Sequence, residues 1–139
     1  QQAFVVADAA GAGVAGGIVL TARDVREVQL ATGSIKVAIV LACRHIGLAA
    51  EDLDEVLLAG AFGSFVRKAS ARRIGLVPAI DPERVRFVGN AAGLGARLAL
   101  VDRAVRTRAR EFAGRVEYVD LATHPDYQET FLGSLAFPA

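Results

Sequence analysis

The chain has 139 residues and a formal net charge of +1, with 16 Lys and Arg residues against 15 Asp and Glu residues. This balance gives no electrostatic reason to expect binding to nucleic acid or to an anionic membrane surface. Hydrophobic residues make up 53% of the chain, but the longest apolar stretch, residues 37–43, is far shorter than the roughly 20 residues that span a bilayer. We therefore expect a soluble, cytoplasmic protein whose length suits one domain or one lobe of a larger one.

The chain contains no Met and begins Gln1-Gln2, without the basic start and apolar core of a signal peptide, so we expect a fragment of a longer protein. Its single cysteine, Cys43, excludes an internal disulfide and cannot supply the four thiolates of an iron–sulfur cluster. Because Cys43 stands in an apolar run, it is interpreted as a thiol packed in the core. His45 and His124 have no companion His or Cys at ligand spacing, and we predict no metal site.

Periodicity and turn residues predict strands that alternate with helices. The predicted strands cover residues 4–7, 18–20, 56–59, 86–88 and 116–119. The predicted helices cover residues 22–46, 70–74, 91–112 and 125–135. The first two strands are expected to form a hairpin with the Gly- and Ala-rich residues 9–17 as its loop. The continuous apolar run at residues 56–59 favours a buried central strand, whereas the alternating run at residues 116–119 favours an edge strand.

Capping residues mark the ends of the predicted helices. Thr21 offers a capping hydroxyl, and Asp24 favours the positive end of the helix dipole. Gly47 supplies a left-handed stop for this helix, and Gly114 ends the helix that begins near residue 91. Ser70 is expected to cap the short helix. The helix over residues 91–112 is expected to pack through Leu94, Leu98, Val101 and Val105.

Strands alternating with long helices indicate an α/β layer, in which ligands bind at the carboxyl ends of the strands. The first Gly-rich turn at such an end is Gly60-Ala61-Phe62-Gly63. Small residues let a flat adenine or ribose touch the backbone, free N–H groups suit a phosphate, and Phe62 can form a wall for the ring. The turn is equally compatible with a tight connection in which Phe62 fills the core.

The second Gly-rich turn begins with Gly89 and Asn90. Its glycine spacing differs from the G-x-G-x-x-G dinucleotide motif, and no Lys-Ser or Lys-Thr follows to make a P-loop. We expect Gly93, Gly95 and Ala96 to let two helices cross closely, with direct nucleotide contact as the alternative. No catalytic triad, carboxylate pair or nucleophile elbow can be assembled, so no catalytic residue is predicted.

Several sequence motifs together resemble one protein family. They read DVREVQLA at residues 24–31, LAGAFG at 58–63, GNAAGLGAR at 89–97, and VEYVDL at 116–121 followed by THPDYQ at 123–128. In this order they resemble the carboxy-terminal domain of reductive activators of corrinoid proteins. The resemblance covers nearly the whole chain from about residue 18.

The resemblance implies an α/β fold, a ribonuclease H-like lobe of an actin-like ATPase with a mixed sheet and packed helices. Members of the family join an amino-terminal [2Fe–2S] ferredoxin domain to an ATPase domain of the actin, hexokinase and Hsp70 superfamily. They use ATP, held with Mg, to return cobalt(II) corrinoid proteins of methyltransferase systems to cobalt(I). Residues 1–139 would be the carboxy-terminal lobe of such a chain, with a nucleotide and a corrinoid protein as partners, and a homodimer is compatible with the sequence.

The resemblance also implies roles for individual residues. Residues 60–63 match the turn that lies against the adenosine. Gln29 and Gly33 are expected to form the other wall of the adenine pocket, and Asn90 begins the segment expected to connect the two lobes.

The sequence has no phosphate loop of the Asp-Gly-Thr type, which in this superfamily holds the triphosphate of Mg-ATP. We therefore expect the 139 residues alone to bind nucleotide weakly and not to hydrolyse ATP, so that only the parent protein would be an enzyme. Two alternatives stay open. One is an ATPase activator of 2-hydroxyacyl-CoA dehydratases, against which the lone Cys43 argues, and the other is a non-enzymatic module for dimerisation or partner docking.

Overall fold

The computed structural model describes residues 3–60 and 66–138. The strands in that part are β1 (Ala3–Ala7), β2 (Ile18–Thr21), β3 (Val56–Ala59) and β4 (Val85–Gly89). The α-helices are α1 (Ala9–Ala12), α2 (Ala22–His45), α3 (Lys68–Arg73), α4 (Ala91–Val101), α5 (Arg103–Ala113) and α6 (Tyr127–Ser134). Short 3₁₀ helices, Ala50–Asp52 and Pro82–Arg84, precede β3 and β4. No helix in the described ranges is both long and apolar enough to cross a membrane.

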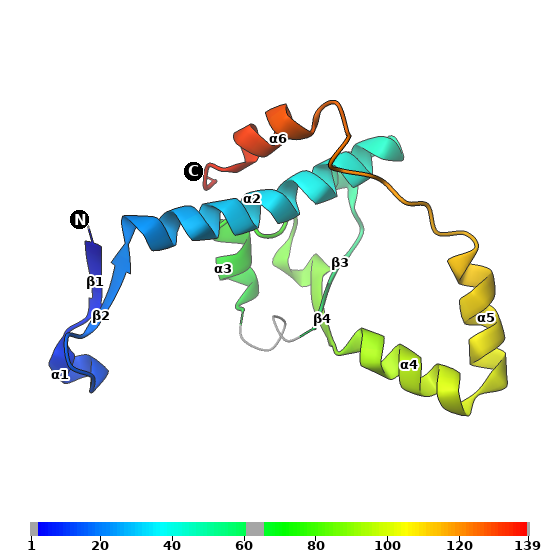
Figure 1. Cartoon of the computed structure of the whole chain (residues 1–139), viewed down its shortest axis with the longest axis horizontal. Coiled ribbons are helices and arrows are strands. Elements are labelled where there is room, and N and C mark those ends of the chain that lie inside the picture. The colour runs from blue at the N-terminus through cyan, green and yellow to red at the C-terminus, as the bar shows by residue number, and fades with distance from the viewer. Residues whose placement is uncertain (1–2, 61–65, 139) are drawn as a thin grey trace.

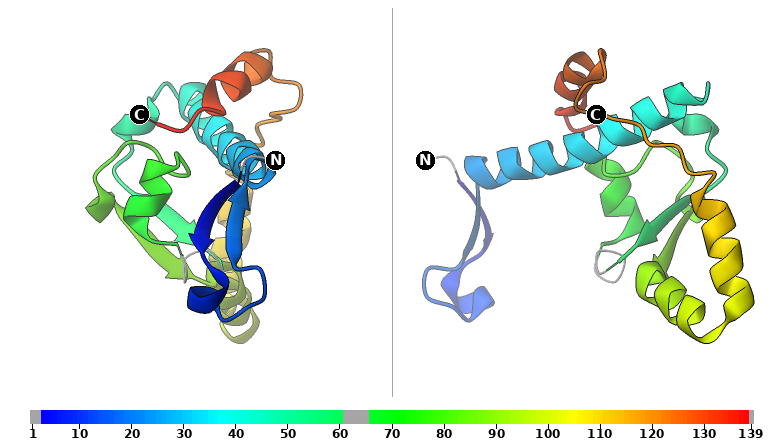
Figure 2. Two further views of the ribbon diagram at one scale, coloured as in Figure 1. Left: turned by 90° about the vertical axis from the view of Figure 1, so that its left-hand side faces the viewer. Right: turned by 45° about the vertical axis from the view of Figure 1, so that its right-hand side comes forward.

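The long helix α2 runs across the molecule, and the other elements are arranged around it (Figure 1). The β1–β2 hairpin lies at the amino-terminal end of α2, whereas β3, β4 and α3 lie beside its carboxy-terminal half, and α6 lies on the other side of α2 (Figures 1 and 2). Helices α4 and α5 extend beyond β4. The α/β class is confirmed, with its strands in two separate sheets among the described residues: β1–β2 is antiparallel and β3–β4 is parallel.

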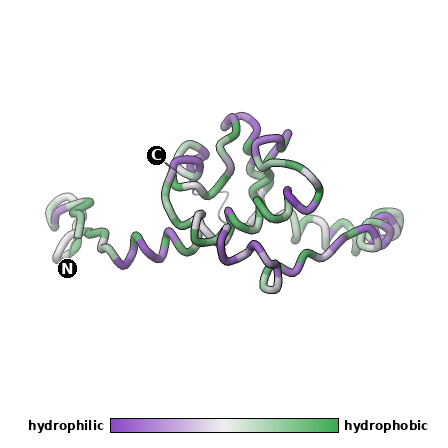
Figure 3. The backbone as a smooth tube through the Cα atoms, turned by 90° about the horizontal axis from the view of Figure 1, so that it is seen from above, coloured by the Kyte–Doolittle hydropathy of each residue, from purple (hydrophilic) through white to green (hydrophobic). Residues whose placement is uncertain are grey.

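The β1–β2 hairpin forms as predicted. Phe4 pairs with Leu20 and Val5 pairs with Val19. These apolar side chains are exposed, and Phe4 retains 69% of its accessible surface. Figure 3 shows the hairpin as a largely hydrophobic stretch near the amino terminus. Because its two strands have no third strand or helix against either face among the described residues, the hairpin contributes little to the core.

The predicted hairpin loop over residues 9–17 is partly wrong, because its first residues form the single-turn helix α1. The side chain of Asp8 accepts a hydrogen bond from the N–H of Gly11 at 2.7 Å. Gly13 then ends the turn with a left-handed backbone, φ 66°. An acidic cap and a left-handed glycine stabilise one helical turn where composition alone indicates a loop.

Helix α2 begins and ends close to the predicted residues. The Thr21 hydroxyl accepts from the N–H of Asp24 at 3.2 Å, and the Asp24 carboxylate accepts from the N–H of Thr21 at 2.8 Å. These reciprocal bonds form a capping box. Hydrogen bonds from the side chain and the backbone of Thr21 hold the pKa of Asp24 below its ordinary value. Gly47 lies just beyond the end of the helix with φ 76°, and Cys43 is buried, as predicted for a core thiol.

Strands β3 and β4 build the main hydrophobic core with α3. The buried members of this core cluster are Ala71, Val77, Ile80 and Val85. The prediction of a fully buried central strand at residues 56–59 is wrong, because inward and outward residues alternate along β3 and Leu57 remains 54% exposed. Only one face of the β3–β4 sheet is covered in the described part of the chain, so a continuous apolar run becomes a half-buried strand.

The short helix α3 begins earlier than predicted. Its N-cap is Arg67, whose backbone is extended and whose side chain makes no capping hydrogen bond. Ser70 therefore lies inside the helix instead of capping it. The predicted end is close, because the N–H of Ile74 donates to the carbonyl of Ser70 and Gly75 follows with φ 73°.

The single helix predicted over residues 91–112 is wrong, because it is divided at Asp102 into α4 and α5. Asp102 has an extended backbone, and its carboxylate accepts from the N–H groups of Ala104 and Val105 at 2.7 and 3.2 Å. A side chain that caps a new helix competes with continuation of the old one. The predicted packed face is also wrong for Leu94, Leu98 and Val101, which are exposed, whereas Val105 is half-buried.

The edge strand predicted over residues 116–119 does not form. These residues have no strand partner among the described residues, and Tyr118 is 84% exposed. Alternation of apolar and polar residues indicates a strand only where a neighbouring strand accepts its hydrogen bonds. The segment is tied to the end of α2 instead, where His45 Nε2 lies 2.8 Å from Glu117 Oε1. The last predicted helix is confirmed as α6, which packs along α2.

Candidate functional site

The first residues of the two predicted Gly-rich turns, Gly60 and Gly89, meet at the carboxyl ends of the parallel strands. The N–H of Gly60, just beyond β3, donates to the carbonyl of Gly89, the last residue of β4, at 2.7 Å. Gly60 has φ 85° and Gly89 has φ 62°. Side chains other than hydrogen are disfavoured in this left-handed region, so glycine is required for both turns to leave the sheet at one edge.

Asn90 begins helix α4 beside this pair of glycines. Its side-chain oxygen accepts from the N–H of Gly93 at 2.9 Å. A Cβ atom added at Gly93 would lie 2.7 Å from the side-chain nitrogen of Asn90, so Gly93 makes room for the cap. The predicted close crossing of helices at Gly93 and Gly95 is wrong for the described residues, because a Cβ added at Gly95 would have no atom within 4 Å.

The residues around Gly60 and Gly89 have small side chains and are accessible from outside. Ala59, Ala91 and Ala92 are exposed, and a Cβ added at Gly60 or Gly89 would meet no atom within 4 Å. A flat ring can therefore reach the main chain from outside, and the amino-terminal end of α4 presents N–H groups at the same edge. The described residues fit the adenosine side of a nucleotide in this respect. Ala61, Phe62 and Gly63 lie outside the described residues.

The other two predicted site residues lie on α2. Gln29 is half-buried in the first half of this helix. Gly33 is buried, and a Cβ added there would lie 3.1 Å from Leu135 Cδ2 and 3.5 Å from Phe131 Cε2. The side of Gly33 is thus occupied by α6 and the residue that follows it. The structure brings Gly60 and Asn90 together at one edge, and it places Gly33 against a different element.

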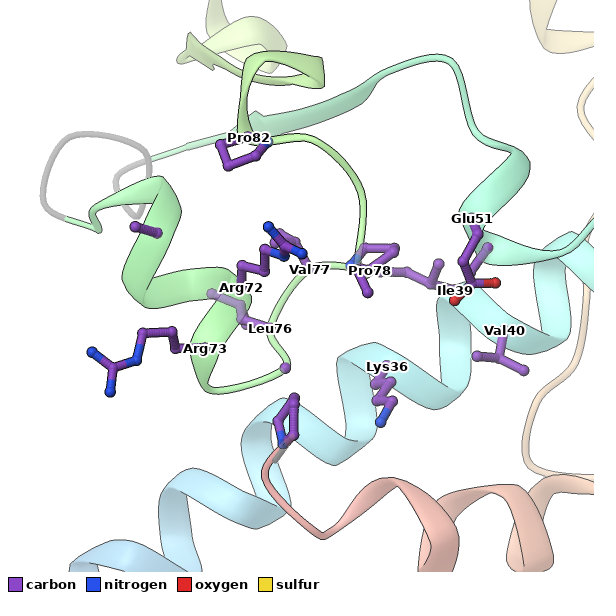
Figure 4. A pocket seen from close by; sticks show the side chains of 15 residues that line it. Lys36, Ile39, Val40, Glu51, Arg72, Arg73, Leu76, Val77, Pro78 and Pro82 are labelled. Carbon is purple, nitrogen blue, oxygen red and sulfur yellow. The ribbon is translucent and has the colours of Figure 1, made fainter.

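A hollow of about 750 Å³ lies near the amino-terminal ends of the same strands, away from Gly60 and Gly89 (Figure 4). It is formed by α2, the 3₁₀ helix before β3, α3, the segment leading to β4 and the end of the chain. Its lining residues are Lys36, Ile39, Val40, Ala50, Glu51, Ala69, Arg72, Arg73, Gly75, Leu76, Val77, Pro78, Ala79, Pro82 and Pro138. None of the predicted site residues is among them.

Sequence reasoning missed this hollow because its walls come from five separate segments. A Cβ added at Gly75 would lie 3.3 Å from Pro138 Cδ, which shows that the end of the chain closes over this turn. The sequence feature that could have indicated the hollow is the presence of two prolines between α3 and β4, because prolines favour rigid turns.

The described residues can be compared with the ligand needs of a metal ion and of an iron–sulfur cluster. No group of three or more His, Cys, Asp or Glu side chains that could hold a metal ion occurs in residues 3–60 and 66–138. The one cysteine of the chain, Cys43, is buried in α2. The described residues therefore offer no set of four ligands for a [2Fe–2S] cluster.

Comparison with known proteins places the chain in a family. Over 120 residues it is 36% identical to the corrinoid activation enzyme RamQ of Eubacterium limosum, an alignment that covers 86% of this chain and 20% of that protein. Over 123 residues it is 28% identical to the [Co(II) methylated amine-specific corrinoid protein] reductase of Methanosarcina barkeri, which covers 87% of this chain and 23% of that protein. The chain thus spans about a fifth of the length of these relatives. A family model described as the C-terminal domain of RACo, the ASKHA domain, matches residues 1–139, and the chain belongs to this family.

Proposed function

We propose that the chain is the carboxy-terminal part of an ATP-dependent reductive activator, which returns cobalt(II) corrinoid proteins to cobalt(I). In this proposal the chain contributes the adenosine side of the nucleotide site. The observation that carries it is the hydrogen bond from the Gly60 N–H to the Gly89 carbonyl, which joins two open glycine turns at the carboxyl edge of parallel strands. Ligands of open α/β sheets bind at this edge.

The relatives support the corrinoid part of the proposal. One is named for corrinoid activation and the other for a corrinoid protein, which favours a corrinoid activator over an activator of 2-hydroxyacyl-CoA dehydratases. The partner proposed for the full-length protein is therefore a corrinoid protein. The iron–sulfur cluster and the groups that hold Mg belong, in this proposal, to parts of the protein other than these 139 residues, because the described residues bring together no three His, Cys, Asp or Glu side chains that could hold a metal ion.

The contribution of these residues is to bind and orient. The backbone at Gly60 and Gly89 lets the adenosine approach closely, and residues 61–63 are proposed to complete that turn. Asn90 fixes the first turn of α4 by capping Gly93, so that the edge keeps one shape. A nucleotide held between this edge and a second lobe would favour the closed arrangement of the lobes, because it would bind that arrangement more tightly. The 139 residues alone are proposed not to hydrolyse ATP.

The experiment measures nucleotide affinity in the full-length protein, by fluorescence titration with an ATP analogue carrying an N-methylanthraniloyl group. Gly60→Val adds a branched side chain at φ 85°, where such residues are strained. We expect the affinity to fall by about tenfold or more, which corresponds to about 1.4 kcal/mol. Reduction of the cobalt(II) corrinoid protein, followed by its absorption spectrum, should fall in parallel at subsaturating ATP.

The matched control is Gly95→Val, because Gly95 lies inside α4, takes no part in the hydrogen bond between Gly60 and Gly89, and a Cβ added there would meet no atom within 4 Å. Its cost is confined to helix propensity, and nucleotide affinity should stay unchanged. Equal affinity of the Gly60→Val protein and the unmodified protein, with both folded by circular dichroism, would contradict the proposal.

A second candidate function is partner docking without nucleotide. The observation that favours it is the exposed apolar surface of the hairpin, where Phe4, Val5 and Val19 retain about half or more of their accessible area. Contiguous exposed apolar residues mark interaction surfaces. Light scattering after size-exclusion chromatography tests this candidate by measuring the molar mass with and without ATP. A dimer whose mass is the same in both conditions would favour docking or dimerisation, whereas a mass that changes with nucleotide would favour the first proposal.

A further inference from the structure

We propose that the hollow between α2, α3 and the segment before β4 is a second binding site, which takes a small organic anion with an apolar body and one phosphate or carboxylate group. Its volume of about 750 Å³ lies within the range of small-molecule sites. This proposal does not depend on the proposed nucleotide site, since the two use different residues.

The walls of the hollow are apolar and stiff. Val77 is 4% exposed and belongs to the core cluster that also contains Ala71 and Val85. Pro78 and Pro82 lie in the segment that leads to β4 and line the hollow. Pro138 closes the hollow where it contacts the turn at Gly75. Proline rings restrict the backbone, so the walls are largely formed before a ligand arrives.

The charged groups of the hollow are mainly positive. Lys36 comes from α2 and Arg72 from α3, and Arg73 and Glu51 also line the hollow. In Figure 4 the side chain of Arg72 extends toward Val77, whereas that of Arg73 extends away from it. Among the described residues, no ion pair or side-chain hydrogen bond engages these four charged groups.

The ligand class follows from this combination. Lys36 and Arg72 line the hollow from two different helices, and each can donate a charge-assisted hydrogen bond to an oxygen of a phosphate or carboxylate. Glu51 disfavours a ligand with several negative charges spread over its surface. The apolar area around Ile39, Leu76 and Val77 then has to be covered by the body of the ligand.

Its position separates this hollow from the edge proposed for adenosine. The segment that forms it runs from the end of α3 to the start of β4, whereas Gly60 and Gly89 lie at the other ends of the strands. In a parallel pair the amino-terminal ends of the strands lie together at one end of the sheet and the carboxyl ends lie together at the other. An anion in the hollow therefore contacts neither Gly60 nor Gly89, which are not among its lining residues.

The test uses the full-length protein and saturation-transfer difference NMR with phenyl phosphate and benzoate, which combine one ring with either head group. Inorganic phosphate is the anion without a body, and benzyl alcohol is the body without a charge. We expect saturable binding of phenyl phosphate, benzoate or both. The tighter of the two identifies the head group. We expect the double variant Lys36→Gln/Arg72→Gln to weaken this binding about tenfold or more, since two charge-assisted bonds are lost.

A matched control and a blocking variant complete the experiment. Arg26→Gln/Arg108→Gln removes the same number of charges from exposed positions outside the hollow, and it should leave binding unchanged. Ala79→Phe places a ring at an exposed lining position and should abolish binding without lowering the melting temperature.

Three results would overturn the proposal. The first is the absence of saturable binding by both probes, which includes the case in which another part of the full-length protein fills the hollow. The second is equal binding to the Ala79→Phe variant. The third is binding of benzyl alcohol as tight as that of phenyl phosphate, because the charges would then have no role. Nucleotide affinity, measured in the same variants, should not change, which separates this test from that of the proposed function.

Discussion

The two small sheets of this protein are built from similar apolar runs but end in different surroundings. In the β3–β4 sheet, Val85 is 1% exposed and packs in the core with Ala71 and Ile80. In the β1–β2 sheet, Val19 is 48% exposed, and the apolar residues on both strands face outward. The difference lies in what covers each sheet: α3 and the segment before β4 pack on one, and no described element covers either face of the other.

This contrast indicates where the stability of the chain resides. Burial of apolar area is the main favourable contribution to folding, and here it is concentrated around β3, β4, α3 and α2. The hairpin and the α4–α5 pair instead present apolar side chains to the outside, as with Leu100 and Val101. Exposed apolar surface of this extent is typical of contact surfaces, and substitutions should therefore have unequal effects in the two regions.

The largest expected effect compares one valine from each sheet. Val85→Ala should lower the free energy of unfolding by about 2 kcal/mol, because two buried methyl groups are lost and a cavity remains. Val19→Ala should change it by less than about 0.5 kcal/mol. Urea unfolding of both variants of the 139-residue chain, followed by circular dichroism, measures the two values. Equal effects would show that the hairpin is covered in solution.

A somewhat smaller effect is expected where α6 packs on α2. Gly33→Leu should destabilise the protein by about 1.5 kcal/mol, because the new side chain overpacks the contact with Phe131 and Leu135. Ala31→Leu, at an exposed position of the same helix, is the matched control and should be nearly neutral. If Gly33→Leu lowers nucleotide affinity in the full-length protein while stability is unchanged, Gly33 lines the adenine pocket as the family resemblance implies.

The junction between the hairpin and α2 should show a third effect, which depends on pH. Thr21→Ala should cost about 1 kcal/mol near neutral pH, because the capping box is lost. The pKa of Asp24 is lowered in the folded protein. Its ionised form therefore stabilises the fold above the ordinary value of 3.8, and this stabilisation is lost as the pH falls through the lowered pKa.

Melting temperatures of the wild type and the Thr21→Ala variant, measured from neutral pH down to about pH 2.5, check this prediction. The difference between the two proteins should narrow in acid. A constant difference would mean that the hydroxyl stabilises the helix without help from the carboxylate.

The smallest effect is expected at the exposed ion pair that ties residues 115–121 to the end of α2. Glu117→Gln should cost less than about 0.5 kcal/mol, because ion pairs between exposed groups are weakened by water and by side-chain entropy. Chemical denaturation at low and at high salt measures it. A loss much larger than this would show that the pair anchors the whole segment and that the open regions are more ordered than their exposure indicates.

Local interactions made some predictions succeed. Thr21, Asp24 and Gly47 mark the ends of α2 through contacts with residues only a few positions away. The hairpin strands, β4, α6 and the burial of Cys43 follow from short apolar patterns in the same way. Local interactions also explain two wrong predictions, the loop in place of α1 and the single helix in place of α4 and α5. Asp8 and Asp102 cap helices there, but composition and periodicity were given more weight than these capping residues.

For the candidate site, the sequence indicated the two glycine turns, and the structure shows that Gly60 and Gly89 are hydrogen-bonded to each other. The roles of residues 60–63, Gln29, Gly33 and Asn90 in nucleotide binding stay predictions. The packing of Gly33 against α6 was not accessible from the sequence, because its partners Phe131 and Leu135 are about a hundred positions away.

The sequence by itself determined the ends of α2, the positions of the four strands β1 to β4 and the family to which the chain belongs, because these depend on neighbouring residues or on motifs. Only the tertiary structure decided which face of β3 is buried, that residues 116–119 have no strand partner in the described part of the chain, and that five segments enclose a hollow beside Lys36 and Arg72. Burial and pairing depend on what lies opposite in space, and residues far apart in the chain supply it.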